Sequence, residues 1–196
     1  MGNFRNLWLA WKGARQFTGR ANKDQSIVVY SEGSGYWKFL GPVVSSLIAD
    51  YGREIDYVTS DINDPVLSNT PPNVRGYYVG SGSAFVYALQ TLRAAVLLMT
   101  TPDLNNFHLK RSRYPVHYTY LHHSMVSTHM IYRNAAFDAF DSILCVGPHH
   151  IAETREWEKR HGLPKKELFE HGYGPLDLIM TQKKARNTLA QDPDRL

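Results

Sequence analysis

Residues 114–133, YPVHYTYLHHSMVSTHMIYR, change their hydrophobic period halfway along. Residues 116–121 are mostly β-formers, and Pro115 stands at the entry, where a strand tolerates a residue without an N–H group. From residue 125 to residue 133 the apolar and cationic positions recur at spacings of three and four, which is typical of a helix. Two histidines and a serine, residues 122–124, therefore fall where a strand is expected to turn into a helix.

This junction is the first candidate for a functional site. In an open α/β sheet the carboxyl ends of the strands face the ligand crevice. Histidine has the unperturbed pKa nearest neutrality, so it suits proton transfer at pH 7. Neighbouring side chains on a strand point to opposite faces, so we expect one of His122 and His123 to face the core and the other the crevice.

The remaining sequence alternates short β-rich runs with helical patterns, which favours a doubly wound, mainly parallel α/β sheet. We expect about six strands, at residues 26–30, 55–58, 77–79, 95–99, 116–121 and 142–146. Helices are expected at residues 36–51, 83–92 and 151–161, and a last short apolar segment begins at Phe169.

The composition is that of a folded domain. Of the 196 residues 43% are hydrophobic, which is enough for a core, and no apolar run approaches the length of a membrane span, about 20 residues. The single cysteine, Cys145, excludes a disulfide framework and favours a reducing compartment. The formal net charge of +4 fits anionic partners such as phosphate polymers, nucleotides or an anionic membrane surface.

The chain divides into three parts. Residues 1–25 are a basic and aromatic segment, residues 26–180 the α/β domain, and residues 181–196 a linker or surface tail. Within the first part, residues 6–20 mix Leu and Trp with Lys and Arg. This pattern fits either an interfacial helix or a helix packed on the edge of the domain.

The predicted strand ends carry polar or glycine-rich tips. In a parallel sheet all these tips lie on one edge, so their residues are candidates for the site. A Gly-Ser-Gly turn before a helix can present backbone N–H groups to a phosphate. The tip residues that we single out are Glu32, Asp61, Gly80, Ser81, Gly82, Ser83, Asp103 and His149.

Several familiar motifs are absent from the sequence. We find no Rossmann Gly-x-Gly-x-x-Gly and no P-loop lysine motif. The sequence also lacks His-Glu-x-x-His and any cysteine pair with zinc spacing, so we expect no metal site.

Three stretches resemble the CDP-glycerol:poly(glycerophosphate) glycerophosphotransferase family, the teichoic-acid-type polymerases and primases of bacteria. Leu121-His122-His123-Ser124 stands where that family has a strand ending in Trp-His-Gly, which aligns His123 with the family's catalytic histidine. Residues 143–150 are similar to its strand, Ser-Pro-type turn and helix. Residues 172–177 keep Gly, Tyr and Asp of its Gly-Tyr-Pro-Arg-x-Asp motif. After the histidine, the family's Gly-Thr-Pro-Leu-Lys is replaced here by Ser-Met-Val-Ser-Thr.

The resemblance implies one Rossmann-like half of a two-domain glycosyltransferase B type architecture, on the acceptor side. It implies transfer of glycerol phosphate from CDP-glycerol, a donor substrate rather than a cofactor, to a hydroxyl of a cell-surface polymer. His123 is then the expected base for that hydroxyl. Residues expected to orient the base or to bind the acceptor and its phosphates are His122, Ser124, Ser127, Arg111, Arg113 and His149, with the tip residues named above.

The expected partners are an anionic polymer or lipid-linked acceptor, a C-terminal donor-binding domain and a peripheral membrane contact, and we expect no nucleic acid. The expected location is the cytoplasm, or the inner face of the cell membrane. Two other functions fit the same sequence. The chain is alternatively a non-catalytic binding or membrane-docking module, or a different sugar-nucleotide glycosyltransferase of the same fold.

The sequence contains no second alternating βαβ series, and the residues after Asp177 are too few to form one. We therefore expect residues 1–196 to fold alone without turning over CDP-glycerol. We expect CDP-glycerol to bind this chain with a dissociation constant of about millimolar, because half of the protein's contacts with the donor are missing.

Overall fold

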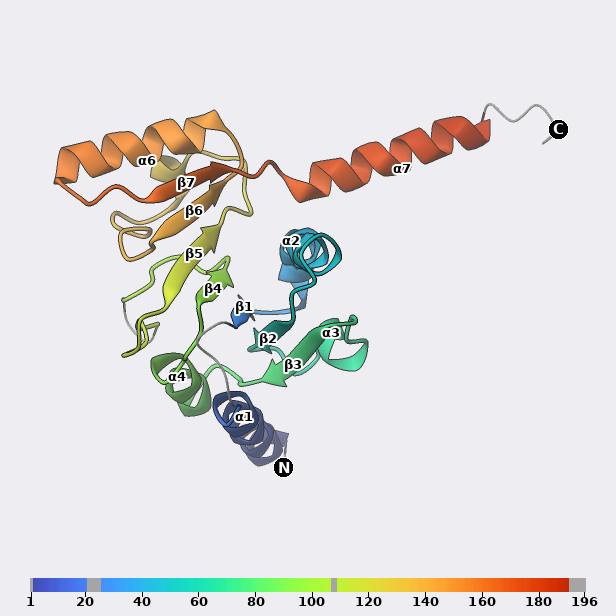
Figure 1. Ribbon diagram of the computed structural model, residues 1–196, viewed down its shortest axis with the longest axis vertical. Helices are drawn as coiled ribbons and strands as arrows, with labels where there is room; N and C mark the ends of the chain where they lie inside the picture. Colours follow the sequence, from blue (N-terminus) through green and yellow to red (C-terminus); the bar gives the residue numbers. More distant parts are fainter. Residues whose placement is uncertain (1, 21–25, 107–108, 191–196) are drawn as a thin grey trace.

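The structure is a computed structural model that describes residues 2–20, 26–106 and 109–190, with the backbone alone for residues 2–3 and 185–190. Seven strands form one sheet in which every neighbouring pair is parallel, and helices cover both faces (Figure 1). The predicted doubly wound, parallel, Rossmann-like α/β class is confirmed.

The chain alternates strands with helices in the expected way. The strands are β1 (Ile27–Ser31), β2 (Ile55–Thr59), β3 (Val74–Tyr78), β4 (Val96–Met99), β5 (His117–Leu121), β6 (Ser142–Cys145) and β7 (Glu167–Glu170). The helices are α1 (Gly2–Thr18), η1 (Ser34–Tyr36), α2 (Trp37–Ala49), α3 (Pro65–Ser68), α4 (Ser83–Gln90), α5 (Thr128–Ile131), α6 (Pro148–His161) and α7 (Gly174–Ala190).

The central strands are buried on both faces, as their continuous apolar runs predict. Consecutive residues such as Val28 and Val29, or Leu97 and Leu98, belong to two different core clusters. This is the period-two alternation of a strand. The larger cluster lies between the sheet and α1 and α4, and the smaller one between the sheet and α2.

The strand order is β3-β2-β1-β4-β5-β6-β7, so the chain changes direction across the sheet between β1 and β4. Because all strands are parallel, their carboxyl ends share one edge, which we call the tip edge. Ligands of open α/β sheets bind outside the carboxyl ends, at such a switch point. The tips predicted after residues 30, 58, 79, 99, 121 and 146 all lie on this edge.

One strand boundary and the number of strands differ from the prediction. β3 begins at Val74 rather than at residue 77, because Val74 already pairs with Ile55 of β2. The segment at Phe169 is part of β7, a seventh strand. Its residues are exposed except for the half-buried Leu168, so an edge strand of this kind carries little hydrophobic signal.

The helix predicted at residues 125–133 was also wrong. The only helical turn there is α5, which has four residues. The apolar residues of the pattern do not form a buried face, because Met125, Val126, Met130 and Ile131 are all exposed. A periodic spacing without burial provides no packing energy to hold a helix together.

At the carboxyl end, α7 begins at Gly174, before the expected tail, and extends away from the sheet (Figure 1). It contacts α2 near its start, where the position of a Cβ on Gly174 is 3.3 Å from Pro42. Residues 191–196 of the expected tail and residues 21–25 of the N-terminal segment lie outside the described residues. None of the helices in the described part of the chain has both the length and the apolar character needed to cross a membrane.

The N-terminal segment forms α1, which packs along β3 and α4 (Figure 1). Its inward face is buried and includes Ala10, Ala14 and Phe17. Gly13 lies so close to β3 that a Cβ on it would be 2.0 Å from the carbonyl oxygen of Tyr78. The expectation of a helix packed on the edge of the domain is therefore confirmed for this face.

We predict that Gly13→Ala destabilises the protein. Helix propensity alone favours alanine by about 1 kcal/mol, whereas overpacking against a backbone carbonyl costs about 1–3 kcal/mol or more. Urea unfolding should show a net loss of stability. Gly35→Ala is the control, since a Cβ there meets nothing within 4 Å. A stabilised Gly13→Ala variant would show that α1 is not held this closely.

Candidate functional site

His122 and His123 follow β5 directly and point in different directions. His122 is only 2% exposed. Its ring stacks on His150 of α6, with centroids 3.9 Å apart, and packs against Tyr120 and Phe137 at 5.0 and 5.3 Å. Burial lowers the pKa of His122 to about 3, so the ring is neutral near pH 7.

Neither ring nitrogen of His122 has a hydrogen-bond partner among the described residues. The hydroxyls of Thr100 and Thr101, at the end of the neighbouring strand β4, are also buried and unpaired within this part of the chain. Buried polar atoms without partners destabilise a fold. They concentrate at the tip edge, next to the candidate site.

His123 lies on the opposite side and is partly exposed. The rings of Tyr36 and Phe39 are each 5.5 Å away, and the Tyr120 hydroxyl is 3.5 Å from Nδ1. Burial lowers the pKa of His123, although the Glu32 carboxylate and a hydrogen bond to the backbone of Leu121 act in the opposite direction. A neutral ring that donates one nitrogen to a backbone carbonyl keeps a lone pair on the other, which can accept a proton.

A cluster of tyrosines and one carboxylate surrounds His123. Burial raises the pKa of Tyr36, and the nearby Glu32 raises it further. The pKa of Tyr120 is raised well above its ordinary value, chiefly by burial, and its hydroxyl lies 3.4 Å from that of Tyr132. These groups come from the tips of β1 and β5, which the fold brings to one edge.

Sequence reasoning missed Tyr36 and Phe39 as neighbours of His123, and it missed Tyr132, whose hydroxyl lies near that of Tyr120. Tyr36 and Phe39 belong to the start of the helical pattern predicted at residues 36–51, and nothing in that pattern marks them as neighbours of the site. The available signal was the turn at residues 32–35, which predicts that the first residues of the next helix also lie near the tip edge.

The loop that follows His123 is held by α6. His149 and His150 donate from Nε2 to the carbonyls of Met125 and Val126, at 3.2 and 2.9 Å. The Glu153 carboxylate accepts hydrogen bonds from the backbone and hydroxyl of Thr128, at 2.8 and 2.6 Å. These contacts hold residues 125–128 in a loop, where the sequence pattern predicts a helix.

Ser124 and Ser127 lie in this loop. The Ser124 hydroxyl accepts a 3.5 Å hydrogen bond from the backbone of Val126. Ser127 is hydrogen-bonded to Glu153, which helps to lower the pKa of that carboxyl. With His149, these serines lie at the tip edge. His149 and Glu153, the partner of Ser127, both act on the pKa of His122 and lie on its side, whereas His123 lies on the α2 side.

The glycine-rich tip at residues 80–83 is on the same edge but four strands from β5, a separation of about 19 Å. Gly80 is buried with φ +63°, and its carbonyl accepts a 2.7 Å hydrogen bond from Ser60. Ser81, Gly82 and Ser83 are exposed and line an open hollow with Tyr87 and Gln90.

The other two acidic tip residues hold loops in place. Asp61 accepts backbone hydrogen bonds from Ser34 and Asn63, at 3.2 and 2.9 Å, and the Asn63 contact contributes most to lowering its pKa. Asp103 has φ +60° and donates its N–H to the carbonyl of Ala136 at 2.8 Å. Both residues fix the shape of the tip edge.

Arg111 and Arg113 are not brought to the site. Arg111 pairs with Asp141 and also donates to the carbonyls of Val116 and Ala139. Asp141 and Val116 precede strands β6 and β5, so this cluster lies at the amino-end edge, opposite His123. The reason is the chain path, which must return to that edge between two parallel strands.

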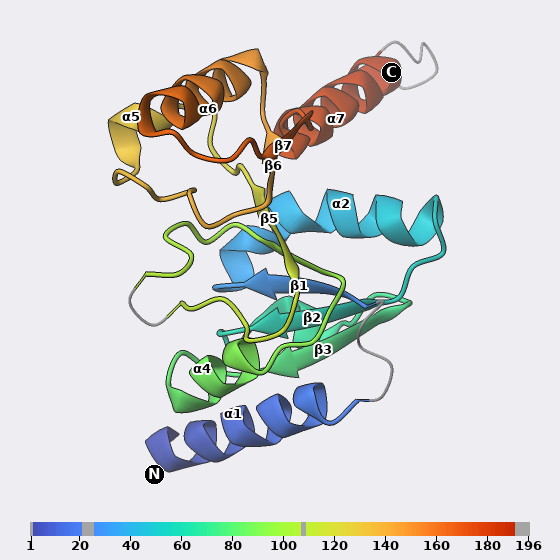
Figure 2. The ribbon, with the colours of Figure 1, turned by 60° about the vertical axis from the view of Figure 1, so that its left-hand side comes forward.

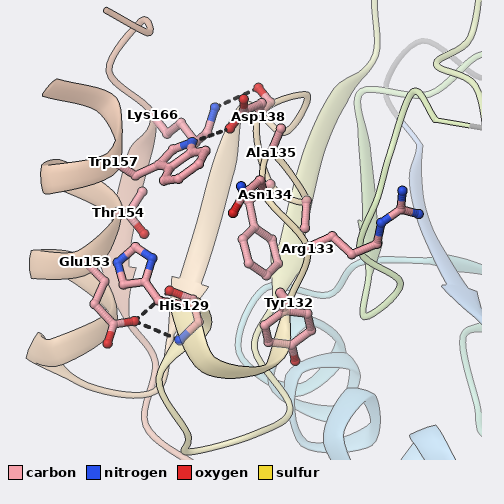
Figure 3. Close-up of a pocket in the computed structure, with 13 residues that line it drawn as sticks. His129, Tyr132, Arg133, Asn134, Ala135, Asp138, Glu153, Thr154, Trp157 and Lys166 are labelled. Atoms are coloured by element: carbon pink, nitrogen blue, oxygen red, sulfur yellow. Dashed lines mark hydrogen bonds between the residues drawn. The ribbon is translucent and has the colours of Figure 1, made fainter. Parts of the chain in front are cut away.

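A separate small cavity of about 40 Å³ lies between the loop at residues 128–138 and α6 (Figure 3). Trp157 donates from Nε1 to Asp138 Oδ1 at 2.9 Å, and Lys166 donates to the Asp138 carbonyl at 2.8 Å. None of the residues predicted for the site lines it. In the described part of the chain, no group of three or more His, Cys, Asp or Glu is placed to hold a metal ion.

The fold and the tip edge together define a Rossmann-like α/β domain with a histidine-centred candidate site. No protein-family model matches the sequence, and no curated protein matches it. A similar solved structure is that of the wall teichoic acid polymerase TagF, as a histidine-to-asparagine variant soaked with CDPG. The TM-score is 0.55 at 11% sequence identity, and the match covers 96% of this chain and 52% of the TagF chain.

This likeness shows the fold. At 11% identity it carries no statement about the role of this chain. The chain spans about half the length of the TagF chain that it matches.

We predict that His122→Phe weakens the dependence of stability on pH. The pKa of His122 is about 3 in the folded protein and 6.5 in the unfolded chain, so the unfolded state binds the proton first as pH falls below 6.5. Stability is therefore lost between pH 6.5 and 3. Between pH 7.5 and 5.0 this loss is up to about 2 kcal/mol for the single group.

Urea unfolding of both proteins at these two pH values measures the difference. The lowered pKa values of His123, His150 and His171 are common to wild type and variant and cancel in the comparison. Equal losses in the two proteins would show that His122 is not held neutral.

Proposed function

We propose that this chain is the acceptor-side domain of a glycerophosphotransferase-like enzyme, which transfers glycerol phosphate from CDP-glycerol to a hydroxyl of a cell-surface polymer. The observation that carries the proposal is His123, a partly exposed neutral imidazole at the carboxyl end of β5, beside Glu32 and Tyr36. The fold-level likeness to a teichoic acid polymerase and the sequence resemblance at residues 121–124 support the same reaction class.

The chemistry requires a base, because a hydroxyl is a poor nucleophile. In the proposed reaction the acceptor oxygen forms a bond to phosphorus, the bond from phosphorus to the cytidylate oxygen breaks, and the hydroxyl proton passes to His123. The Glu32 carboxylate favours the imidazolium that results, since it already raises the pKa of His123. Tyr36, whose pKa is raised chiefly by burial, keeps its hydroxyl protonated and donates a hydrogen bond to Glu32.

Phosphoryl transfer also needs positive charge near the phosphate oxygens. Lys38 is a cation close enough to His123 to act on its pKa. It lowers the pKa of His123, and its Nζ is 4.9 Å from the ring centroid of Phe39. We assign Lys38 to phosphate contact in place of Arg111 and Arg113, which lie at the opposite edge.

The donor side is proposed to come from a second domain. The chain spans about half of the TagF chain, and in the proposed enzyme the donor nucleotide binds a C-terminal domain that faces the tip edge. An anionic or lipid-linked polymer occupies the acceptor side. His149, Ser124 and Ser127 are proposed to contact that acceptor, because they lie on the same edge as His123.

The test is a transfer assay with labelled CDP-glycerol and glycerol phosphate oligomers, using this chain together with its donor-binding domain. We predict that His123→Ala lowers kcat by about 100-fold or more, the scale of lost general-base catalysis. The acid limb of kcat/KM should lie below pH 6.5, because the pKa of His123 is lowered and the base must be neutral.

Two control variants accompany this experiment. His129→Ala removes an exposed imidazole beside Trp157 and should leave kcat nearly unchanged. His122→Ala should act mainly through stability, because the ring is buried. Equal, small losses for His122→Ala and His123→Ala would refute the base assignment. Transfer from a different sugar nucleotide, with none from CDP-glycerol, would refute the proposed donor.

A further inference from the structure

Two open hollows line the exposed side of α4 and share one residue. The first lies at the tip edge, has a volume of about 570 Å³ and includes Ser81, Ser83 and Tyr87. The second, of about 270 Å³, is lined by Gln90, Thr91, Lys110, Arg111 and Arg113. Because Gln90 lines both, the hollows form one continuous surface, which we call the α4 track. Figure 2 shows α4 beside α1, on the face of the sheet that both helices cover.

The α4 track leads from the tip edge to the opposite edge of the sheet. α4 begins at Ser83, just after the tip of β3, and ends at Gln90, before β4 begins. Its eight residues span about 12 Å. Ser83, Tyr87 and Gln90 are exposed and recur at spacings of four and three, so they lie on one face of the helix. The track therefore joins the edge that carries His123 to the edge where β4 and β5 start.

The far end of the α4 track is basic. Lys110 and Arg113 are exposed there, and neither forms an ion pair with an acidic side chain of the described residues. Lys110 donates to a neutral group, the carbonyl of Asn105, at 2.8 Å. Arg111 also lines this hollow, but Asp141 pairs with it. None of the described residues that line the hollow is acidic, so it attracts anions.

Arg93 adds a further cation beside this hollow. Its guanidinium carbon lies 4.0 Å from the ring centroid of Tyr114, and that of Arg113 lies 5.2 Å from the same centroid. A hydrogen bond with Arg93, together with the charges of both arginines, lowers the pKa of the Tyr114 hydroxyl. A positive potential favours the anionic form of a phenol in this way, and it favours a phosphate group for the same reason.

The segment that carries these cations is fixed to the end of α4. The Ser112 hydroxyl donates to the carbonyl of Leu92 at 2.6 Å, and the Arg113 N–H donates to the carbonyl of Gln90 at 3.3 Å. The paired Arg111 anchors the same segment to the sheet. Because the backbone is already ordered, an anion that binds here does not have to order a loop.

We propose that the α4 track binds the part of the acceptor polymer that does not react, with Arg93, Lys110 and Arg113 against the phosphates of a glycerol phosphate chain. The inference rests on the proposed function, in which such a chain is the acceptor. Lys38 then contacts the reacting phosphate near His123, while the α4 track holds phosphates several units away.

The geometry sets a minimum length for an acceptor that reaches both places. The tip of β3 is about 19 Å from that of β5, and the α4 track adds about 12 Å. A glycerol phosphate unit contributes six main-chain bonds, or about 7 Å when it is as extended per bond as a stretched polypeptide. About five units therefore separate the reacting hydroxyl from the basic end of the track.

A glycerol phosphate chain fits the α4 track better than a single-stranded nucleic acid. The bases of a single strand bind by stacking on a series of exposed aromatic rings. At the basic end Arg93 and Arg113 lie over the ring of Tyr114, which leaves Tyr87 as the exposed ring among the described residues that line the track. A glycerol phosphate chain has no rings to stack and has a phosphate in every unit, so cations alone can hold it.

The first experiment is calorimetric titration of the 196-residue chain with a glycerol phosphate oligomer of about twenty units, without CDP-glycerol. Such a chain can occupy several phosphate contacts at once. Lys110→Glu/Arg113→Glu should weaken its binding at least tenfold. The milder Lys110→Gln/Arg113→Gln should lower the slope of log affinity against log salt by about 1.4, because each neutralised phosphate of a single strand contributes about 0.7.

The matched control makes the same change in net charge elsewhere. Lys159→Glu/Lys165→Glu reverses two exposed cations, one on α6 and one before β7, and should bind the oligomer as the wild type does. The proposal fails if the wild type does not bind the oligomer, or if both double variants lose affinity equally. It also fails if oligothymidylate of equal charge binds more tightly than the glycerol phosphate oligomer, which would assign the track to a nucleic acid.

A second experiment uses the transfer assay with acceptors of two lengths. Lys110→Glu/Arg113→Glu should raise KM for the oligomer of about twenty units at least fivefold and leave kcat unchanged. It should leave KM for a dimer unchanged, because a dimer at His123 is too short to reach the basic end. Equal rises in KM for both acceptors would overturn the track. The titration requires no transfer, so intact oligomer binding without any transfer would refute the proposed reaction alone.

Discussion

The parallel pairing of all seven strands is the constraint on which the candidate site depends. It forces each strand to end on the same edge, so residues as far apart in sequence as Glu32 and His123 become neighbours. The same constraint removes Arg111 from that edge, because a segment that leads into the next parallel strand must lie at the opposite edge. Whether a polar residue follows a strand or precedes one therefore decides on which edge of the sheet it lies and which other polar residues it can act with.

Alternation along β5 then separates the two histidines. One ring is stacked on His150 beneath the loop, and the other lies beside Tyr36 and Phe39 on the α2 side. The buried ring is maintained although neither of its nitrogens has a hydrogen-bond partner in the part of the chain that the structure describes. Its neighbours from α6 hold the loop that shapes the site. The two adjacent histidines thus lie in different surroundings, one buried and one partly exposed.

Much of the fold follows from the sequence, because β-branched runs such as residues 26–30 have no other stable place than a covered strand. The edge strand β7 and the loop after His123 could not be predicted in the same way. β7 buries almost nothing, and the helical spacing at residues 125–133 has no core to face. For the site, the sequence indicates His123 and Glu32 through their place at strand ends. The contribution of Tyr132 depends on a loop whose shape is set by contacts with α6, which spacing does not encode.

The central claim is that His123 is a neutral base at the acceptor side of the tip edge. Nitrogen-15 NMR of the histidine rings at pH 7, with and without glycerol phosphate oligomers, tests it most directly. The account predicts a His123 ring protonated on one nitrogen, whose signals shift when the oligomer is added while those of the buried His122 do not. A doubly protonated His123 ring at pH 7, or shifts confined to histidines far from the tips such as His161, would contradict it.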